Sequence, residues 1–222
     1  MMTNLFSTFD PATSMNQSLN WASTLLFMTL MPWTYWMIPS RYSTTISMLM
    51  NKLNNEMKML LEKKSMFSIM FISMFMLITM NNMMGLSPYV FTSSSHLVFS
   101  MTLAIPLWFS LMLFGWVKKS QMMFAHLVPE GSPFVLMPFM VIIETISNMI
   151  RPGSLAVRLT ANMIAGHLLM SLLGNNSLNM NNFTITMIMI IQISLLIFEM
   201  AVAIIQAYVF SILSTLYTKE VI

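Results

Sequence analysis

Arg158 is the residue with the clearest chemical consequence, because it lies in the middle of a long apolar segment. An arginine at the centre of a membrane helix costs roughly 3 kcal/mol on insertion scales and about 10 kcal/mol or more in simulations of isolated helices. The guanidinium group cannot escape this cost by losing its proton, because it stays protonated at every accessible pH. A charge kept in such a place indicates a function, so we expect Arg158 to act as a fixed positive charge.

Other polar side chains share a helix face with Arg158. At about 100° per residue, this stripe lies within roughly 40° of its first member and consists of Glu144, Asn148, Arg151, Arg158 and Asn162. A second helix carries Gln192, Glu199 and Gln206 at intervals of seven residues, which also places them on one face. Carboxylates and histidines such as His167 exchange protons, and amides, hydroxyls and water bridge the gaps. Two such stripes are what a proton path requires.

The electrostatics of Arg158 predict how such a path would work. At an effective dielectric constant near 20, a carboxylate about 4 Å from it gains about 4 kcal/mol when ionised. A carboxylate moved past Arg158 must therefore release its proton, and one moved into lipid must take a proton up. We expect the mobile carboxylate on a partner, because Ala161 and Ala165 beside Arg158 would allow a partner helix to approach closely. The alternative is a structural ion pair between Arg158 and Glu144 or Glu199.

The composition indicates an all-α integral membrane protein with a single membrane domain, residues 1–222. Hydrophobic residues make up 57% and charged residues 8%, whereas globular domains carry about 25% charged residues. The net charge of +3 does not indicate nucleic-acid binding, because the basic residues are few and scattered. With no cysteine, three scattered histidines and no phosphate-binding loop, we expect no cofactor, no metal and no catalytic site. The 30 methionines indicate a genetic code that reads an extra codon as Met, as in animal mitochondria.

The apolar segments predict the elements that position these side chains. We expect transmembrane helices over residues 20–38, 66–86 and 97–117, and two long tilted helices over residues 134–173 and 183–216. Residues 41–64 differ, because their apolar positions form a single stripe opposite charged side chains. This pattern predicts a helix that lies flat on the membrane surface; a short soluble helix packed on a partner is the alternative.

The loop charges predict the orientation. Cations such as Lys58, Lys118 and Lys219 occur in only some of the loops, and the positive-inside rule places all of these loops on the inner face. Residues 134–173 must then cross the membrane once. As a straight helix they would be about 60 Å long, so fitting a core of ~30 Å requires a tilt of roughly 60°. A helix so close to the membrane plane would suit a protein that wraps around a neighbour.

Residues 155–167 read LAVRLTANMIAGH, residues 144–153 read ETISNMIRPG, and residues 198–210 read FEMAVAIIQAYVF. These segments resemble a known family, the a subunits of F-type ATP synthases. The opening residues 4–11, NLFSTFDP, are similar to the animal mitochondrial version of the family. The resemblance covers nearly the full chain.

The resemblance implies a stator subunit in the mitochondrial inner membrane, against which a ring of c subunits turns. Its further partners would be other membrane-sector and peripheral-stalk subunits. It implies that Arg158 is the essential arginine between two half-channels, with Asn162 and Gln206 as polar residues beside it. His167 and Glu199 match the intermembrane-space half-channel and Glu144 the matrix half-channel, and Glu220 corresponds by position to a matrix-side acid of some relatives.

Two other functions compete with this one. A secondary transporter or an ion channel with an Arg–Glu gate would bind its solute near the membrane midplane, usually between repeated halves. No internal repeat is visible, which weighs against that alternative. A purely structural membrane subunit is the third possibility.

Overall fold

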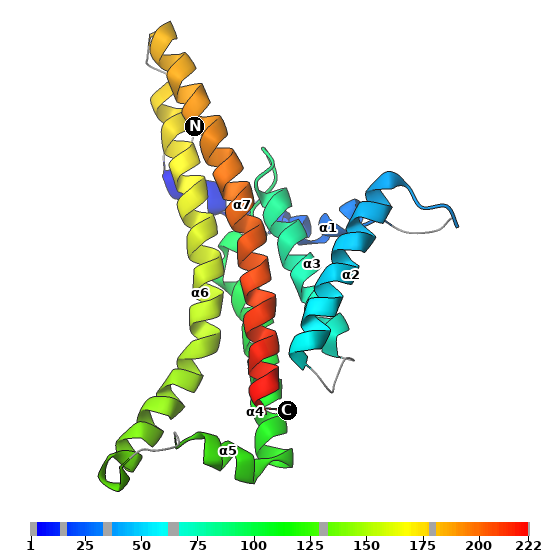
Figure 1. The fold of residues 1–222 in the computed structure, drawn as a ribbon. Coiled ribbons are helices and arrows are strands. Elements are labelled where there is room, and N and C mark those ends of the chain that lie inside the picture. The colour runs from blue at the N-terminus through cyan, green and yellow to red at the C-terminus, as the bar shows by residue number, and fades with distance from the viewer. Residues whose placement is uncertain are drawn as a thin grey trace.

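The computed structural model describes residues 4–13, 17–32, 37–61, 67–128, 133–177 and 181–221. These residues form helices and turns without a strand, which confirms the prediction of an all-α protein. In the described part of the chain, four helices are long and apolar enough to cross a membrane. They are α3 (Phe67–Gly85), α4 (Leu97–Lys118), α6 (Met137–Ser177) and α7 (Asn182–Val221), which run side by side in Figure 1.

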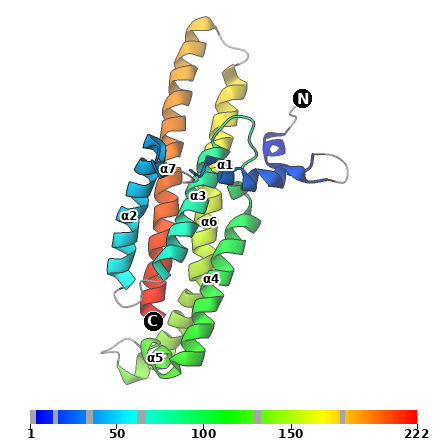
Figure 2. The ribbon, with the colours of Figure 1, turned by 90° about the vertical axis from the view of Figure 1, so that its right-hand side faces the viewer.

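The chain passes up and down this bundle. α3 rises, α4 returns to the short α5 (Ser120–His126), α6 rises and α7 returns, so that the C-terminal residues lie near the end of α4 (Figures 1 and 2). Lys118 at the end of α4 and Lys219 in the last turn of α7 therefore lie at the same end of the bundle, which we call the inner end. The opposite end is called the outer end. The loop charges likewise predict a single pass for α6. The orientation of the bundle in the membrane stays a prediction.

Both long helices extend past the predicted bounds. α6 continues from residue 173 to Ser177, and α7 continues from residue 216 to Val221. The prediction followed the end of each apolar run, but polar residues such as Asn175 and Lys219 continue the helices. α6 also contains Pro152, which lacks a backbone N–H and bends a helix. Figure 1 shows that the inner part of α6 bends away from the bundle.

The segment before α2 differs from the predicted transmembrane helix over residues 20–38. It forms a 3-10 helix, η2 (Leu19–Leu25), and a short helix, α1 (Phe27–Leu30), and residues 33–36 lie outside the described part. Met31 has an extended ψ of 124° because it precedes Pro32, and this ends α1. The helical part, Leu19–Leu30, is shorter than the ~20 residues that a crossing requires. A membrane crossing by this segment stays a prediction.

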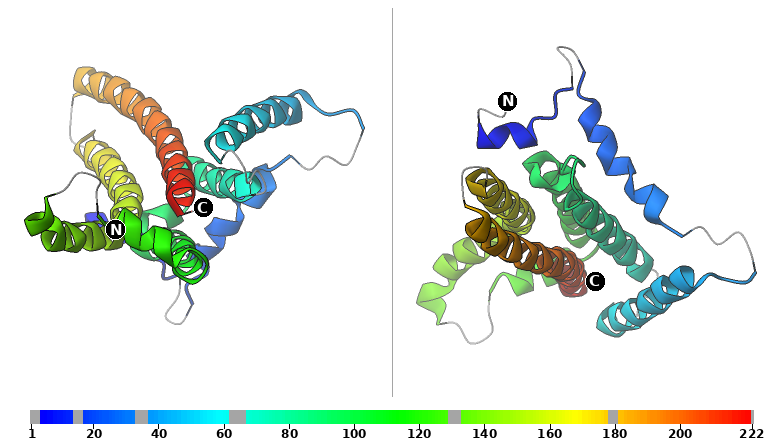
Figure 3. Two further views of the ribbon diagram at one scale, coloured as in Figure 1. Left: turned by 60° about the horizontal axis from the view of Figure 1, so that its bottom comes forward. Right: turned by 90° about the horizontal axis from the view of Figure 1, so that it is seen from above.

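α2 (Arg41–Leu61) packs along α3 and α7 with Met57 and Leu61 buried. The Ser68 hydroxyl donates a hydrogen bond of 2.8 Å to Asn54 Oδ1, and the Tyr208 hydroxyl donates one of 3.2 Å to Glu56 Oε2. The predicted end of this helix, residues 62–64, lies outside the described residues. Its position on a membrane surface stays a prediction. In Figure 3, α2 lies on the side of α3 and α7 that is away from α6.

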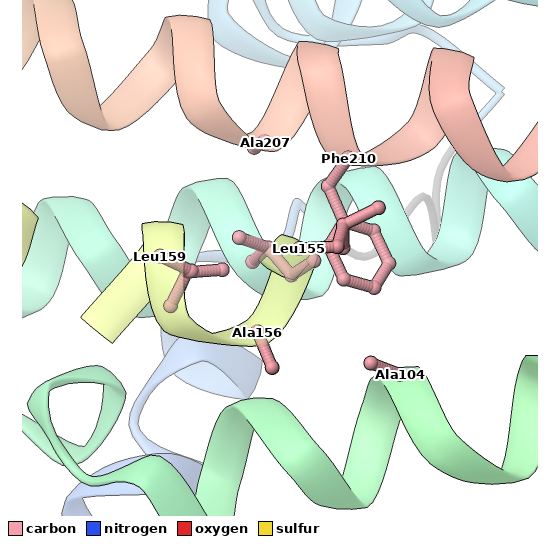
Figure 4. Packing of buried hydrophobic residues seen from close by; sticks show 7 residues of the cluster. Ala104, Leu155, Ala156, Leu159, Ala207 and Phe210 are labelled. Carbon is pink, nitrogen blue, oxygen red and sulfur yellow. The ribbon is translucent and has the colours of Figure 1, made fainter. Parts of the chain in front are cut away.

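The hydrophobic core lies where α3, α4, α6 and α7 meet. Figure 4 shows part of this cluster, which consists of Ile78, Ala104, Leu155, Ala156, Leu159, Ala207 and Phe210. Alanines at the contacts allow the helix backbones to approach closely, and close packing is the main attraction between helices in lipid. Because Leu155 and Leu159 flank Arg158 on α6, this core fixes the rotation of α6 at the level of the arginine.

Candidate functional site

Arg158 lies on the side of α6 that faces away from the core. Its neighbours Leu155, Ala156 and Leu159 are buried, whereas Arg158 itself is exposed. It forms no ion pair with a carboxylate of the described residues, so the alternative pairs with Glu144 and Glu199 are not formed there. Ser154, Ala161, Asn162 and Ala165 are also exposed. Arg158 therefore lies on an open face that has little side-chain bulk.

The side chain of Gln206 on α7 contacts the backbone of Arg158. Gln206 Nε2 donates a hydrogen bond of 3.4 Å to the Arg158 carbonyl oxygen, and Gln206 is buried. Both residues line a small cavity of about 10 Å³, together with Leu155, Leu159, Val209 and Phe210. This volume is close to the minimum that holds one water molecule. Asn162 follows Arg158 one helical turn later, on the exposed side of α6.

A large cleft opens at the inner end, between α4, α5, α6 and the last turn of α7. Its volume is about 740 Å³, and its polar lining includes His126, Glu144, Asn148, Arg151 and Glu220. Arg151 Nη2 lies 3.3 Å from Glu144 Oε1, and Arg151 Nη1 lies 2.8 Å from Glu220 Oε2. The Tyr217 ring lies under the same guanidinium, with its centroid 5.3 Å from Cζ. The two predicted inner acids therefore meet at one arginine.

A second cleft opens on the outer side of Arg158. Its volume is about 390 Å³, and its polar lining includes His167, Ser171 and Gln192. The N-terminal 3-10 helix η1 (Leu5–Phe9) covers part of it, and the Phe9 ring stands edge-on to His167 with centroids 6.4 Å apart. His167 Nε2 is buried and has no hydrogen-bond partner among the described residues. The side chain is thus in contact with a cleft but has an unsatisfied nitrogen.

Glu199 lies against α6 between this outer cleft and Gln206. A Cβ atom placed on Gly166 would lie 2.8 Å from Glu199 Cδ and 2.9 Å from Oε1, so only a glycine leaves room for the carboxylate as it stands. Glu199 Oε1 is buried and has no partner among the described residues. The polar stripe of α7 therefore extends from Gln192 in the outer cleft, through Glu199, to Gln206 beside Arg158.

Sequence reasoning placed Arg151 on the polar stripe but gave it no role. Its spacing of seven residues from Glu144 puts both on one face two helical turns apart, which long side chains can bridge, so this contact could have been found. The contact with Glu220 spans 69 residues and depends on the packing of α7. Phe9 and Gly166 were also missed, because their roles depend on tertiary contacts. The structure brings no metal-binding cluster together among its described residues.

Comparisons with known proteins identify the family. The sequence model of the ATP synthase A chain family matches residues 17–219. The chain is 56% identical to ATP synthase subunit a of Drosophila mauritiana, and 57% identical to that of Aedes aegypti and of Anopheles gambiae. Each of these comparisons covers 100% of both chains. This chain, with its two clefts and the arginine between them, therefore belongs to the ATP synthase A chain family.

Proposed function

We propose that the inner and outer clefts are two proton half-channels, that Arg158 is the barrier between them, and that a ring of c subunits carries protons from one to the other. The coarser function follows from the family: the chain is a proton-translocating subunit of the membrane sector of ATP synthase. It is a multi-pass protein of the mitochondrial inner membrane, and other ATP synthase subunits are its partners.

The observation that supports this proposal best is the position of Arg158 between two separate clefts. Along α6, Arg151 in the inner cleft comes seven residues before Arg158 and His167 in the outer cleft nine residues after it. These separations correspond to roughly 10 Å and 14 Å along the helix axis. The linings of the two clefts share no residue. A proton that enters one cleft must therefore be carried past the arginine.

The residues divide between the two half-channels as follows. In the proposal, His167 and Glu199 pass protons from the outer cleft toward the ring. Glu144 and Glu220 receive them in the inner cleft, and Asn162 and Gln206 hold water and the helix register beside Arg158. Carboxylates and imidazole can each take up and release a proton, whereas the guanidinium of Arg158 cannot. This division assigns the exchangeable groups to the clefts and the fixed charge to the gap between them.

The exposed face around Arg158 suits the ring. Ala161 and Ala165 leave room for a partner helix to approach, and exposed apolar side chains such as Val157 and Ile205 would be buried against it. A ring carboxylate about 4 Å from Arg158 would gain about 4 kcal/mol when ionised at an effective dielectric constant near 20. It would release its proton on one side of Arg158 and take one up on the other. The subunit itself would carry no ATP site.

The barrier matters because each proton that leaks is lost to synthesis. A proton that moves down a potential of 100 mV releases about 2.3 kcal/mol, and this is captured only if neither half-channel spans the membrane alone. A transporter or channel with an Arg–Glu gate would need a carboxylate of this chain at Arg158. Neither Glu144 nor Glu199 forms that pair in the structure.

The test uses ATP synthase complexes reconstituted in vesicles. It compares complexes in which this subunit carries Arg158→Gln, Arg158→Lys or Arg41→Gln. Arg41 is exposed at the start of α2, so its substitution removes the same charge away from both clefts. We expect Arg158→Gln to lower proton-driven ATP synthesis by roughly 100-fold or more, and Arg41→Gln to leave it unchanged. Arg158→Lys should fail as well, whereas a purely structural ion pair would tolerate it in part. Normal synthesis by Arg158→Gln would overturn the proposed barrier.

A further inference from the structure

We propose that Arg151 is a positioning residue of the inner half-channel that holds Glu144 and Glu220 together as carboxylates, so that protons leave the ring side without being retained. This inference rests on the proposed function, because it assigns a role within the inner cleft. It adds a cation to a half-channel whose other candidate groups are acids.

The contacts of Arg151 support this role. Two different nitrogens of one guanidinium reach two carboxylates, at 3.3 Å for Glu144 and 2.8 Å for Glu220. Glu144 lies on α6 itself and Glu220 on the last turn of α7, so the same side chain joins two helices. Arginine suits this geometry because its planar group has five N–H donors and pairs with carboxylates through charge-assisted hydrogen bonds.

The surroundings of the three side chains leave Arg151 as the central charge of the cleft. Among the described residues that line it, Arg151 is the one arginine and no lysine is present. α5 contributes His126, and α4 contributes apolar and tryptophan side chains. From α7 the Tyr217 ring packs under the guanidinium at 5.3 Å. His126 is thus the other titratable side chain among the described residues that line the cleft.

The two acids would behave differently without the arginine. Glu144 and Glu220 would then be neighbouring carboxylates in one cleft, and a nearby like charge favours the protonated form of one of them. A proton that arrives from the ring side would be retained until the inner solution became more alkaline. With Arg151 present, one guanidinium contacts both carboxyl groups, and its positive charge opposes the repulsion between them. They can then pass a proton on to the inner solution with little retention.

The exposure of the groups limits the size of the effect. The side chain of Arg151 is 29% exposed, that of Glu144 33% and that of Glu220 59%. Solvent screens such pairs, so the expected effect is smaller than for buried groups. We therefore expect loss of Arg151 to shift the pH dependence of the inner side and not to abolish transport.

The test measures ATP synthesis by reconstituted complexes at a fixed driving force while the pH on the inner side is varied. In Arg151→Gln we expect the midpoint of this profile to move to higher pH, with the maximal rate restored at alkaline inner pH. Arg151→Lys keeps the charge, so its midpoint should stay close to that of the unmodified chain. Arg41→Gln is the matched control for charge loss, and its profile should be that of the unmodified chain. An unshifted profile in an assembled Arg151→Gln complex would overturn the inference.

A double variant separates positioning from a general loss of structure. Glu220→Gln removes one of the two like charges, so Arg151→Gln should shift the midpoint less when Glu220→Gln is also present. Equal shifts in both backgrounds would contradict the inference, and this comparison needs only the shift and not the absolute rate. The proposed function has its own test in Glu144→Gln. Normal proton release by Glu144→Gln would overturn the proposed inner half-channel. Slow release by Glu144→Gln together with an unshifted pH profile of Arg151→Gln would overturn the role of Arg151 alone.

Discussion

Gln206 Nε2 donates a hydrogen bond of 3.4 Å to the backbone carbonyl oxygen of Arg158, across 48 residues and between two helices. The bond involves the backbone of Arg158 and leaves its guanidinium on the exposed face of α6. It therefore fixes the register of α6 against α7 at the level of the charge, without using the charge itself.

The register contact can be removed with Gln206→Leu, which keeps the approximate size of the side chain. We expect a loss of about 1 kcal/mol in the free energy of unfolding, the usual net value of one hydrogen bond, and a clear fall in ATP-driven proton pumping. The measurements are thermal unfolding of the complex and acidification of vesicles. Ser194→Ala is the control, because Ser194 is exposed on the same helix and its hydroxyl donates a hydrogen bond to the local carbonyl oxygen of Ile191. Full pumping by Gln206→Leu would show that the contact is dispensable.

Gly166→Ala tests the position of Glu199. The new methyl group would lie 2.8 Å from Glu199 Cδ, so the carboxylate must move. Because the obstructing atoms are the end of a flexible side chain, we expect little change in stability. A displacement of about 1 Å can nevertheless lower a reaction rate by up to ~100-fold, so we expect roughly tenfold slower proton uptake from the outer side.

The matched control for this substitution is Gly174→Ala, since a Cβ atom there would have no atom within 4 Å. Gly174 lies in the same helix, and alanine favours helix formation over glycine by about 1 kcal/mol. Gly174→Ala should therefore leave proton uptake unchanged. Equal rates of proton uptake in both variants would show that the contact between Gly166 and Glu199 does not affect proton uptake.

Cysteine labelling tests whether the clefts open to opposite faces. The chain contains no cysteine, so an introduced thiol is its single reactive thiol. Modification of that thiol can be measured as an increase in the mass of this subunit. Ser171→Cys lies in the outer cleft and Asn148→Cys in the inner cleft. We expect an impermeant thiol reagent to modify the first only from the outer side and the second only from the inner side. Modification of both from one side would contradict the two half-channels.

The same thiol at residue 171 reports on the segment that covers the outer cleft. Phe9→Ala removes the ring that stands against His167, so labelling of Ser171→Cys should become faster. Phe6 lies in the same 3-10 helix but is 68% exposed, and Phe6→Ala should leave the rate unchanged. A faster rate in both variants would indicate that the whole segment had detached.

The sequence predicted the parts of this fold that depend on apolar pattern. Helical periodicity placed Glu144, Arg158 and Asn162 on one face of α6, and the resemblance linked Glu199 and His167 to the outer side. The contacts between helices could not be predicted in the same way. The approach of Glu220 to Arg151 depends on where α7 ends, and α7 ends five residues beyond its apolar run. Likewise, a lone glycine such as Gly166 gives no signal until the neighbouring helix is placed.

Glu199 and Glu144 belong to different half-channels in the proposed function. Glu199 lies against Gly166 on the outer side of Arg158, and Glu144 pairs with Arg151 in the inner cleft. Glu199→Gln should slow ATP synthesis most when the outer proton concentration is low, because the uptake step has lost its exchanging group. Glu144→Gln should slow it most when the inner proton concentration is high, because release is then opposed by rebinding. Rates measured while each pH is varied separately distinguish the two. If both variants responded to the same side, one of these carboxylates would be assigned to the wrong half-channel, and the position of Arg158 as the barrier between them would lose its support.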